Sequence, residues 1–179
     1  MTETAILGGG CFWCLEAVYR QMRGITSVIP GYAGGAVLHP TYKQVCSGLT
    51  GHAEVVKLEW DPAILNYQQI LQCFFALHDP TTLNRQGNDV GSQYRSVIFY
   101  TSAQQYEIAK EVIQRITDSN LWGSPLVTQL CALDTFWPAE PEHHNYYAKH
   151  PHAGYCQAVI APKLAKARKA LGNLLHPAP

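Results

Sequence analysis

The sequence lacks any apolar run that approaches the roughly 20 residues needed to span a bilayer. It also lacks an excess of charge, since 13 Lys and Arg residues balance 13 Asp and Glu residues and the formal net charge is zero. The one concentrated basic stretch lies near the C-terminus, at Lys163, Lys166, Arg168 and Lys169. These absences argue against a membrane, and against nucleic acid, as the main partner.

A signal peptide is also lacking, because residues 1–4 carry no basic region and no long apolar segment follows them. We therefore expect a cytoplasmic location, where the six cysteines would be free or catalytic thiols rather than disulfides. No repeat, low-complexity tract or linker divides the chain. At 179 residues and 47% hydrophobic, it can bury its own core without disulfides, so we expect one monomeric domain over residues 1–179.

Short runs rich in Val, Ile and aromatic residues alternate with segments of helical periodicity. The strand pattern is clearest where Val56, Leu58 and Trp60 share one face. We expect strands over residues 4–7, 25–30, 53–60, 92–100 and 126–133. We expect helices over residues 11–22, 67–77, 103–117 and 163–175.

This order of elements predicts an α+β fold, with a two-layer ferredoxin-like mixed sheet and helices packed on it. The C-terminal segment, about residues 135–179, should wrap over the body as a long coil to residue 151 and then form a short helix. Residues 31–52 are rich in Gly, Pro, Thr and Ser. An irregular segment of that length is usually functional or disordered, and its aromatic residues and cysteine favour a function.

Cys11 is the first candidate for chemistry, because it follows a predicted strand and three glycines and opens a predicted helix. The positive end of a helix dipole stabilises a thiolate and lowers a thiol pKa from about 8.5 toward roughly 3.5 to 7.5. Core packing is the commoner role of a cysteine, and the glycines do not match a phosphate-binding loop. Position alone therefore leaves both interpretations open.

Cys14 stands three residues after Cys11, and a helix would place both sulfurs on one face. This Cys-x-x-Cys spacing makes a thioredoxin-like thiol-disulfide oxidoreductase an alternative function. Simple helix packing explains Cys14 equally well.

Glu54 is anomalous because it lies in line with the apolar face of the strand over residues 53–60. Removal of a carboxylate from water raises its pKa, so Glu54 could donate a proton near neutral pH. A strand-end position that still reaches water is the alternative.

Several longer motifs follow one another along nearly the whole chain, and together they resemble the peptide methionine sulfoxide reductase A family. The motifs are Gly10-Cys11-Phe12-Trp13, Gly31-Tyr32-Ala33-Gly34-Gly35, Pro40-Thr41-Tyr42, Val45-Cys46-Ser47-Gly48, Gly51-His52-Ala53-Glu54, His78-Asp79-Pro80-Thr81-Thr82, residues 84–96, Phe136-Trp137-Pro138-Ala139-Glu140 and Gly154-Tyr155-Cys156.

The resemblance implies a peptide-methionine (S)-S-oxide reductase, an enzyme of protein repair under oxidative stress. Cys11 would attack the sulfoxide sulfur as a thiolate, and Glu54 would give the proton that the oxygen needs to leave as water. Tyr42 and Tyr94 match two family tyrosines whose hydroxyls would hydrogen-bond the same oxygen.

Three further residues match family positions that hold the substrate. Phe12 and Trp13 would form an apolar wall for its S-methyl group, and Asp89 would contact its backbone. Core packing, or a solvated loop position for Asp89, is the ordinary alternative.

Attack leaves a sulfenic acid on Cys11, which condenses with a second thiol. Cys156 matches the family's recycling position, and a flexible arm after Gly154 could carry it to Cys11. Two departures bear on this step: many members have glycine where Cys14 stands, and no cysteine follows Cys156. Cys14 is therefore a second candidate for recycling, while Cys46, Cys73 and Cys131 are predicted to be structural.

The resemblance also implies thioredoxin as electron donor and methionine sulfoxide, free or in peptides, as substrate. Neither a metal nor an organic cofactor is expected, since the thiols supply both electrons. A metal-binding module on Cys11, Cys14, His143 and His144 is a further alternative, but adjacent histidines lack the usual ligand spacing.

Overall fold

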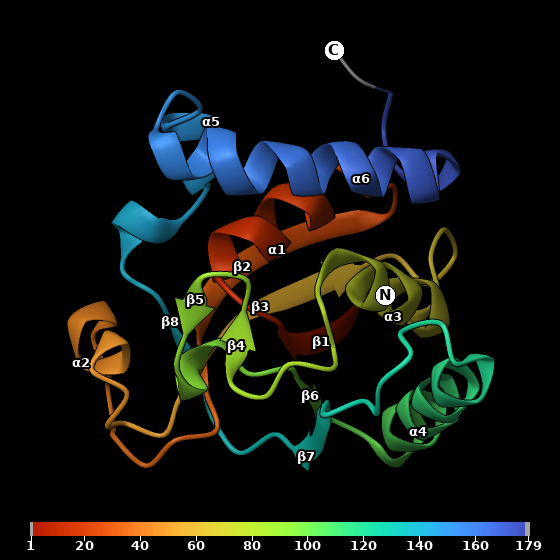
Figure 1. The fold of residues 1–179 in the computed structure, drawn as a ribbon, viewed down its shortest axis with the longest axis horizontal. Helices are drawn as coiled ribbons and strands as arrows, with labels where there is room; N and C mark the ends of the chain where they lie inside the picture. The colour runs from red at the N-terminus through yellow and green to blue at the C-terminus, as the bar shows by residue number, and fades with distance from the viewer. Residues whose placement is uncertain (1, 178–179) are drawn as a thin grey trace.

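The computed structural model describes residues 2–177 and is built around a six-stranded mixed sheet (Figure 1). The strand order is β7-β6-β1-β3-β2-β8, and the pairs are antiparallel except for β6 and β7. The predicted mixed sheet is confirmed. The strands are β1 (Glu3–Gly8), β2 (Ile25–Ala33), β3 (Ala53–Trp60), β6 (Val97–Tyr100), β7 (Gln129–Ala132) and β8 (Phe136–Pro138).

The two faces of the sheet are buried differently. Alternate residues of β3, Val56, Leu58 and Trp60, belong to the main core beneath the helices. Val55 and Ile6 point the other way, into a smaller cluster that also contains Phe99. This period-2 division is what alternation within a strand dictates. It also puts Glu54 on the side of the main core.

Helices cover one face of the sheet, with α6 lying across α1 and α3 (Figure 1). Apolar stripes on α1, α3 and α4 supply this side of the main core, and Asn66 and Ser102 cap α3 and α4 with their side chains. The long helices are α1 (Phe12–Tyr19), α3 (Tyr67–Leu77), α4 (Ala103–Ser119) and α6 (Ala161–Leu171). Within residues 2–177, no helix has the length and apolar character to cross a membrane.

Residues 31–52 contain more regular structure than predicted. Strand β2 runs on to Ala33, and α2 (Tyr42–Cys46) begins with a capping box between Thr41 and Gln44. Reciprocal bonds between these two side chains and the backbone satisfy donors at the start of the helix. That Thr-x-x-Gln signal was available in the sequence.

The strand expected over residues 92–100 begins only at Val97. Before it come a small hairpin, β4 (Arg85–Gln86) with β5 (Asp89–Val90), and the 3-10 turn η1 (Ser92–Tyr94). Gly91 has a φ of 145°, a conformation that β-branched and bulky residues avoid, and it ends the hairpin. Likewise, the strand expected over 126–133 shortens to β7.

The C-terminal segment differs from the predicted long coil. It contains β8, the turn η2 (Pro141–His143), α5 (Tyr146–Lys149), the π-helical turn η3 (Cys156–Ile160), α6 and the turn η4 (Gly172–Leu174). Strand β8 pairs with β2, so its backbone groups are satisfied by a ladder rather than by water. The terminal helix begins at Ala161, two residues before its predicted start.

Candidate active site

The turn after β1 places Cys11 at the start of α1. Gly10 has a φ of 93°, and a Cβ atom there would lie 2.9 Å from the Gln86 side chain. Only glycine fits this close left-handed turn without strain. Cys11 is the N-cap residue of α1, as predicted, and its carbonyl oxygen accepts the Cys14 N–H at 3.1 Å.

Glu54 lies at the beginning of β3 and is fully buried. Its Oε1 atom accepts the Phe12 N–H at 3.1 Å, and Oε2 has no hydrogen-bond partner within residues 2–177. Burial raises the pKa of this carboxyl to about 8, as predicted, while the Phe12 N–H opposes the rise. Glu54 is therefore a neutral acid at pH 7, joined to the helix that begins beside Cys11.

The two neighbouring thiols have opposite pKa shifts. Cys11 is 6% exposed, and burial, then Cys14 and the charge of Glu54, hold its pKa well above the usual range. The Trp13 N–H lowers it, which is the predicted helix-start effect, but the other causes outweigh it. Interaction with Cys11 lowers the pKa of Cys14 to about 7, and the Lys163 ammonium adds to this. The predicted low pKa of Cys11 is thus wrong for this state.

Tyr42 and Tyr94 lie half-buried near the acid. Tyr42 opens α2 and its ring centroid is 6.0 Å from that of Phe12, while Tyr94 ends η1 and packs against the main core. Burial first, and then the charge of Glu54, raise both phenol pKa values. Both hydroxyls therefore keep their protons and remain hydrogen-bond donors.

Aromatic rings surround the start of α1. His143 packs 5.6 Å from Phe12 and 4.2 Å from Tyr42 between centroids. Tyr146 stacks on Trp13 at 3.8 Å with an interplanar angle of 6°. Both come from the C-terminal segment, and neither was singled out in the sequence as packing on Phe12 and Trp13.

Asp89, on β5, is held by the same C-terminal segment. Its Oδ2 atom accepts the Tyr155 hydroxyl hydrogen bond at 2.8 Å, and that hydroxyl lies 3.7 Å from the Cys14 Sγ. Tyr155 thus connects Asp89 with Cys14. The motif Gly154-Tyr155-Cys156 contained this residue, but its spacing gave no sign of a contact with Asp89.

Cys156 is fully buried in η3 rather than carried on a free coil. Burial raises its pKa, and the charge of Cys14 adds to the rise. All six cysteines are free thiols. Cys73 is buried, Cys131 is half-buried and Cys46 is exposed.

We refer to residues 139–156, which lie over these groups, as the cover. Two carboxylates tie it to the body. The Glu16 carboxylate forms a salt bridge with Arg20. It also accepts hydrogen bonds from the N–H groups of Asn145 and Tyr146 at 2.9 and 3.3 Å. Glu140 accepts from the Tyr32 hydroxyl and the Tyr42 N–H, both at 2.9 Å. Sequence analysis assigned neither carboxylate a role.

The four donors of the metal-binding alternative are not gathered. Among residues 2–177, the group whose ligand atoms lie within 4.8 Å of one another is Glu140, Glu142 and His143. Cys11 and Cys14 are not part of it. Both oxygens of Glu140 already accept the hydrogen bonds described above.

A helix-start thiol, a second thiol and a buried neutral acid together define a thiol-dependent redox enzyme. The family model for peptide methionine sulfoxide reductase matches residues 3–174. The chain is 55% identical over 175 residues to peptide methionine sulfoxide reductase MsrA of Polynucleobacter asymbioticus, covering 98% of this chain and 92% of that protein. It therefore belongs to the peptide methionine sulfoxide reductase family.

Solved structures agree with the fold. Mxr1 from Saccharomyces cerevisiae in reduced form has a TM-score of 0.81 and 32% identity, covering 87% of this chain and 89% of that chain. Mxr1 in complex with Trx2 has a TM-score of 0.58 and 22% identity, covering 81% and 84%. The curled mixed sheet with several helices is shared with these structures.

Proposed function

We propose that the protein reduces methionine S-sulfoxide, free or within polypeptides, to methionine. Family membership gives the reaction, and the observation that carries its chemistry is Glu54, a buried acid with a pKa of about 8 beside the helix that Cys11 opens. Such an acid holds its proton at pH 7 until a reaction demands it.

The first chemical step joins Cys11 to the sulfoxide. Cys11 attacks the sulfur, the oxygen passes to the cysteine as a sulfenic acid, and methionine leaves with two more electrons than the sulfoxide had. Glu54 protonates the oxygen as its bond to the methionine sulfur weakens. Hydroxyls of Tyr42 and Tyr94 stabilise its developing charge, which the raised pKa values of both phenols support.

Deprotonation of Cys11 is favoured by the Trp13 N–H at the start of α1, which lowers the pKa of the Cys11 thiol. When Glu54 is protonated it no longer adds negative charge near Cys11, so one of the causes that raise the Cys11 pKa is removed.

Phe12 and Trp13 hold the S-methyl group, and Asp89 meets the substrate backbone. The ring cluster at the start of α1 supports the first assignment. Tyr146 stacks on Trp13, and the Tyr155 hydroxyl donates a hydrogen bond to Asp89. Substrate entry therefore requires the cover to move. A fixed apolar wall and a fixed acid admit one hand of the sulfoxide, which favours the S epimer.

Recycling converts the sulfenic acid into a disulfide and releases water. We propose that Cys14 forms the first disulfide with Cys11, because it lies beside Cys11 with a lowered pKa. Cys156 then exchanges with Cys14 once η3 opens, and the resulting disulfide is presented to thioredoxin. A relative solved in complex with Trx2 supports this class of reductant.

The architecture supports two further assignments. Strands β6, β1, β3 and β2, with α1 and α3 as connections, have the order of a ferredoxin-like unit, to which β7 and β8 are added. We propose that residues 1–179 act as a single catalytic domain around this unit. A cytoplasmic location and a monomeric state stay predictions.

The decisive experiment supplies the purified protein with the S and R epimers of methionine sulfoxide and a thioredoxin system. Rapid reduction of the S epimer alone is expected. Equal rates on both epimers would contradict the fixed pocket. A thiol-disulfide oxidoreductase built on Cys11 and Cys14 would reduce protein disulfides and neither epimer, and it leaves the buried Glu54 unexplained.

A further inference from the structure

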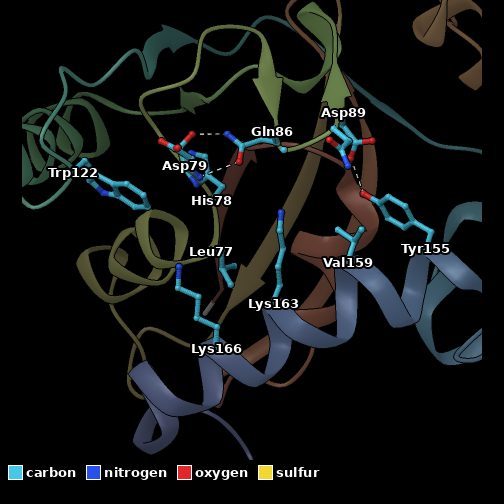
Figure 2. A pocket seen from close by; sticks show the side chains of 12 residues that line it. Leu77, His78, Asp79, Gln86, Asp89, Trp122, Tyr155, Val159, Lys163 and Lys166 are labelled. Carbon is cyan, nitrogen blue, oxygen red and sulfur yellow. Dashed lines mark hydrogen bonds between the residues drawn. The ribbon is translucent and has the colours of Figure 1, made fainter.

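A cavity of about 510 Å³ lies between α6 and the loop that carries β4 and β5 (Figure 2). Its volume falls within the range of ligand sites in proteins. Lys163 and Lys166 line it from α6, and Val159 and Trp122 add apolar surface. Lys166, Val159 and Trp122 have no part in the proposed catalytic steps, and Lys163 enters them only through the pKa of Cys14.

The two lysines bring ammonium groups to this cavity, and neither forms an ion pair within residues 2–177. Lys163 and Lys166 stand three residues apart on α6, so they share a face, and both side chains point from the helix into the cavity (Figure 2). Neither ammonium lies within 4.0 Å of a carboxylate in the part of the chain that the structure describes. Lys163 also lowers the pKa of Cys14 and His78 through its charge.

Two carboxylates line the same cavity, and both are engaged elsewhere. The Asp79 Oδ1 atom accepts the N–H and the hydroxyl of Thr81 at 2.9 and 2.5 Å. Asp89 Oδ2 accepts the Tyr155 hydroxyl. Both carboxylates therefore have hydrogen-bond partners other than the two lysines, and each ammonium group can meet a negatively charged ligand.

The cavity borders the thiol site through two of its lining residues. Asp89 and Tyr155 line one end of it, and the Tyr155 hydroxyl is 3.7 Å from the Cys14 Sγ. A polypeptide whose backbone meets Asp89 thereby reaches the cavity that Lys163 also lines. The apolar surface of Val159 suits the methylene groups of a glutamate side chain, whose carboxylate would reach the ammonium groups.

We propose that this cavity binds an acidic side chain next to the methionine sulfoxide in the substrate polypeptide. The proposal rests on the proposed function, and it deepens it by assigning a substrate class: oxidised methionines in acidic segments. Lys163 and Lys166 are then specificity-determining residues rather than catalytic ones.

The test uses capped five-residue peptides with methionine sulfoxide in the middle. Glu or Gln stands one or two positions before or after it, and dithiothreitol is the reductant, so that thioredoxin is absent. On the side that enters the cavity, Glu should lower KM about two- to fivefold relative to Gln, with kcat changed less than twofold. Raising the salt concentration should shrink the ratio.

Variants locate the effect. The double variant Lys163→Gln, Lys166→Gln should bring the KM ratio between Gln and Glu peptides to about one, and Lys166→Glu should invert it. Lys163→Arg, Lys166→Arg should keep it. Lys169→Gln is the matched control, since Lys169 is an exposed lysine of α6 that does not line the cavity.

Three results would overturn the proposal. Glu and Gln peptides could have equal KM values in the unaltered protein. The lysine variants could leave the peptide ratio unchanged and, in a parallel assay with thioredoxin as reductant, raise the KM for thioredoxin, which would assign the lysines to the reductant. If neither peptides nor free methionine sulfoxide were reduced, the proposed function would fail as well. Reduction without charge preference overturns the cavity assignment alone.

Discussion

Two regions meet at Cys11, and they are held in place by different means. The first, which we call the frame, consists of β1, α1 and β3, where a continuous ladder and the Phe12–Glu54 hydrogen bond fix the acid and the thiol. The second is the cover, whose short turns are held by side-chain bonds and by the packing of His143 and Tyr146 on rings of the body. Cys11 and Glu54 thus stand on regular elements, while access to them depends on a region of short turns.

Removal of the thiol from the frame should have the largest effect. Cys11→Ser is expected to abolish reduction of methionine sulfoxide while the fold stays intact, because serine supplies no thiolate. Single-turnover formation of methionine measures this, with circular dichroism as the control for folding. Turnover near that of the unaltered protein would exclude Cys11 as the nucleophile.

Loss of the acid should rank second. Glu54→Gln is expected to slow the chemical step roughly 100-fold to 10,000-fold, the usual range for a general acid, with little change in substrate binding. Glu54→Asp should recover little, because the shorter side chain misplaces the proton. An unchanged pre-steady-state rate in Glu54→Gln would mean that another group protonates the oxygen.

The same substitution tests the raised pKa of the frame's carboxyl. Its folded-state value of about 8 exceeds the ordinary 4.5, so between these pH values the folded protein holds a proton that the unfolded chain has released. Stability should therefore fall as pH rises through this window. Denaturant titrations at pH 5, 7 and 9 should show a flatter pH dependence for Glu54→Gln, and equal slopes in the two proteins would refute the shift.

Recycling involves thiols of both the frame and the cover. Substitution of these thiols should therefore have effects on turnover smaller than loss of Cys11 or Glu54 and larger than weakening of the cover. Cys14→Ser should leave the first turnover possible and slow disulfide formation. Cys156→Ser should let the Cys11–Cys14 disulfide form and then slow its reduction by thioredoxin. Mass spectrometry after one turnover without reductant locates the bond in each variant. A Cys11–Cys156 disulfide that forms at full rate in Cys14→Ser would show that Cys156 acts alone.

Weakening the cover itself should have the smallest effect. Tyr146→Ala removes the stack on Trp13, an interaction of about 0.5–1.5 kcal/mol beyond its buried area. Hydrogen exchange across residues 146–156 should quicken, and Trp13 fluorescence should shift toward that of a solvated indole. Tyr147→Ala is a neighbouring control, and equal changes in both variants would argue against a specific role for the stack.

The sequence was informative wherever local patterns decide the outcome. Alternation through Val56, Leu58 and Trp60 put Glu54 in the core side of its strand, and burial then raised its pKa as expected. A glycine run followed by helical composition placed Cys11 at a helix start. In these cases the residues of one element and its flanks determine the outcome.

Prediction failed where distant segments meet. The pKa of Cys11 depends on burial and on Glu54, 43 residues away in the chain, which together outweigh the helix start. The environment of Cys156 depends on how η3 packs against α1, although residues near Gly154 resemble a flexible arm. Stacking of Tyr146 on Trp13 likewise has no local signal, because aromatic residues in a Pro-punctuated segment suit many partners.

The bonds of Glu16 to Asn145 and Tyr146 hold one end of the segment that carries Cys156, and α6 holds the other end. The displacement of Cys156 is then limited by the contour length of this segment rather than by its flexibility. Extending the four residues of α5 from helical to strand-like rise lengthens the segment by roughly 7 Å. The distance that the Cys156 thiol can move is thus set by how much of α5 unfolds.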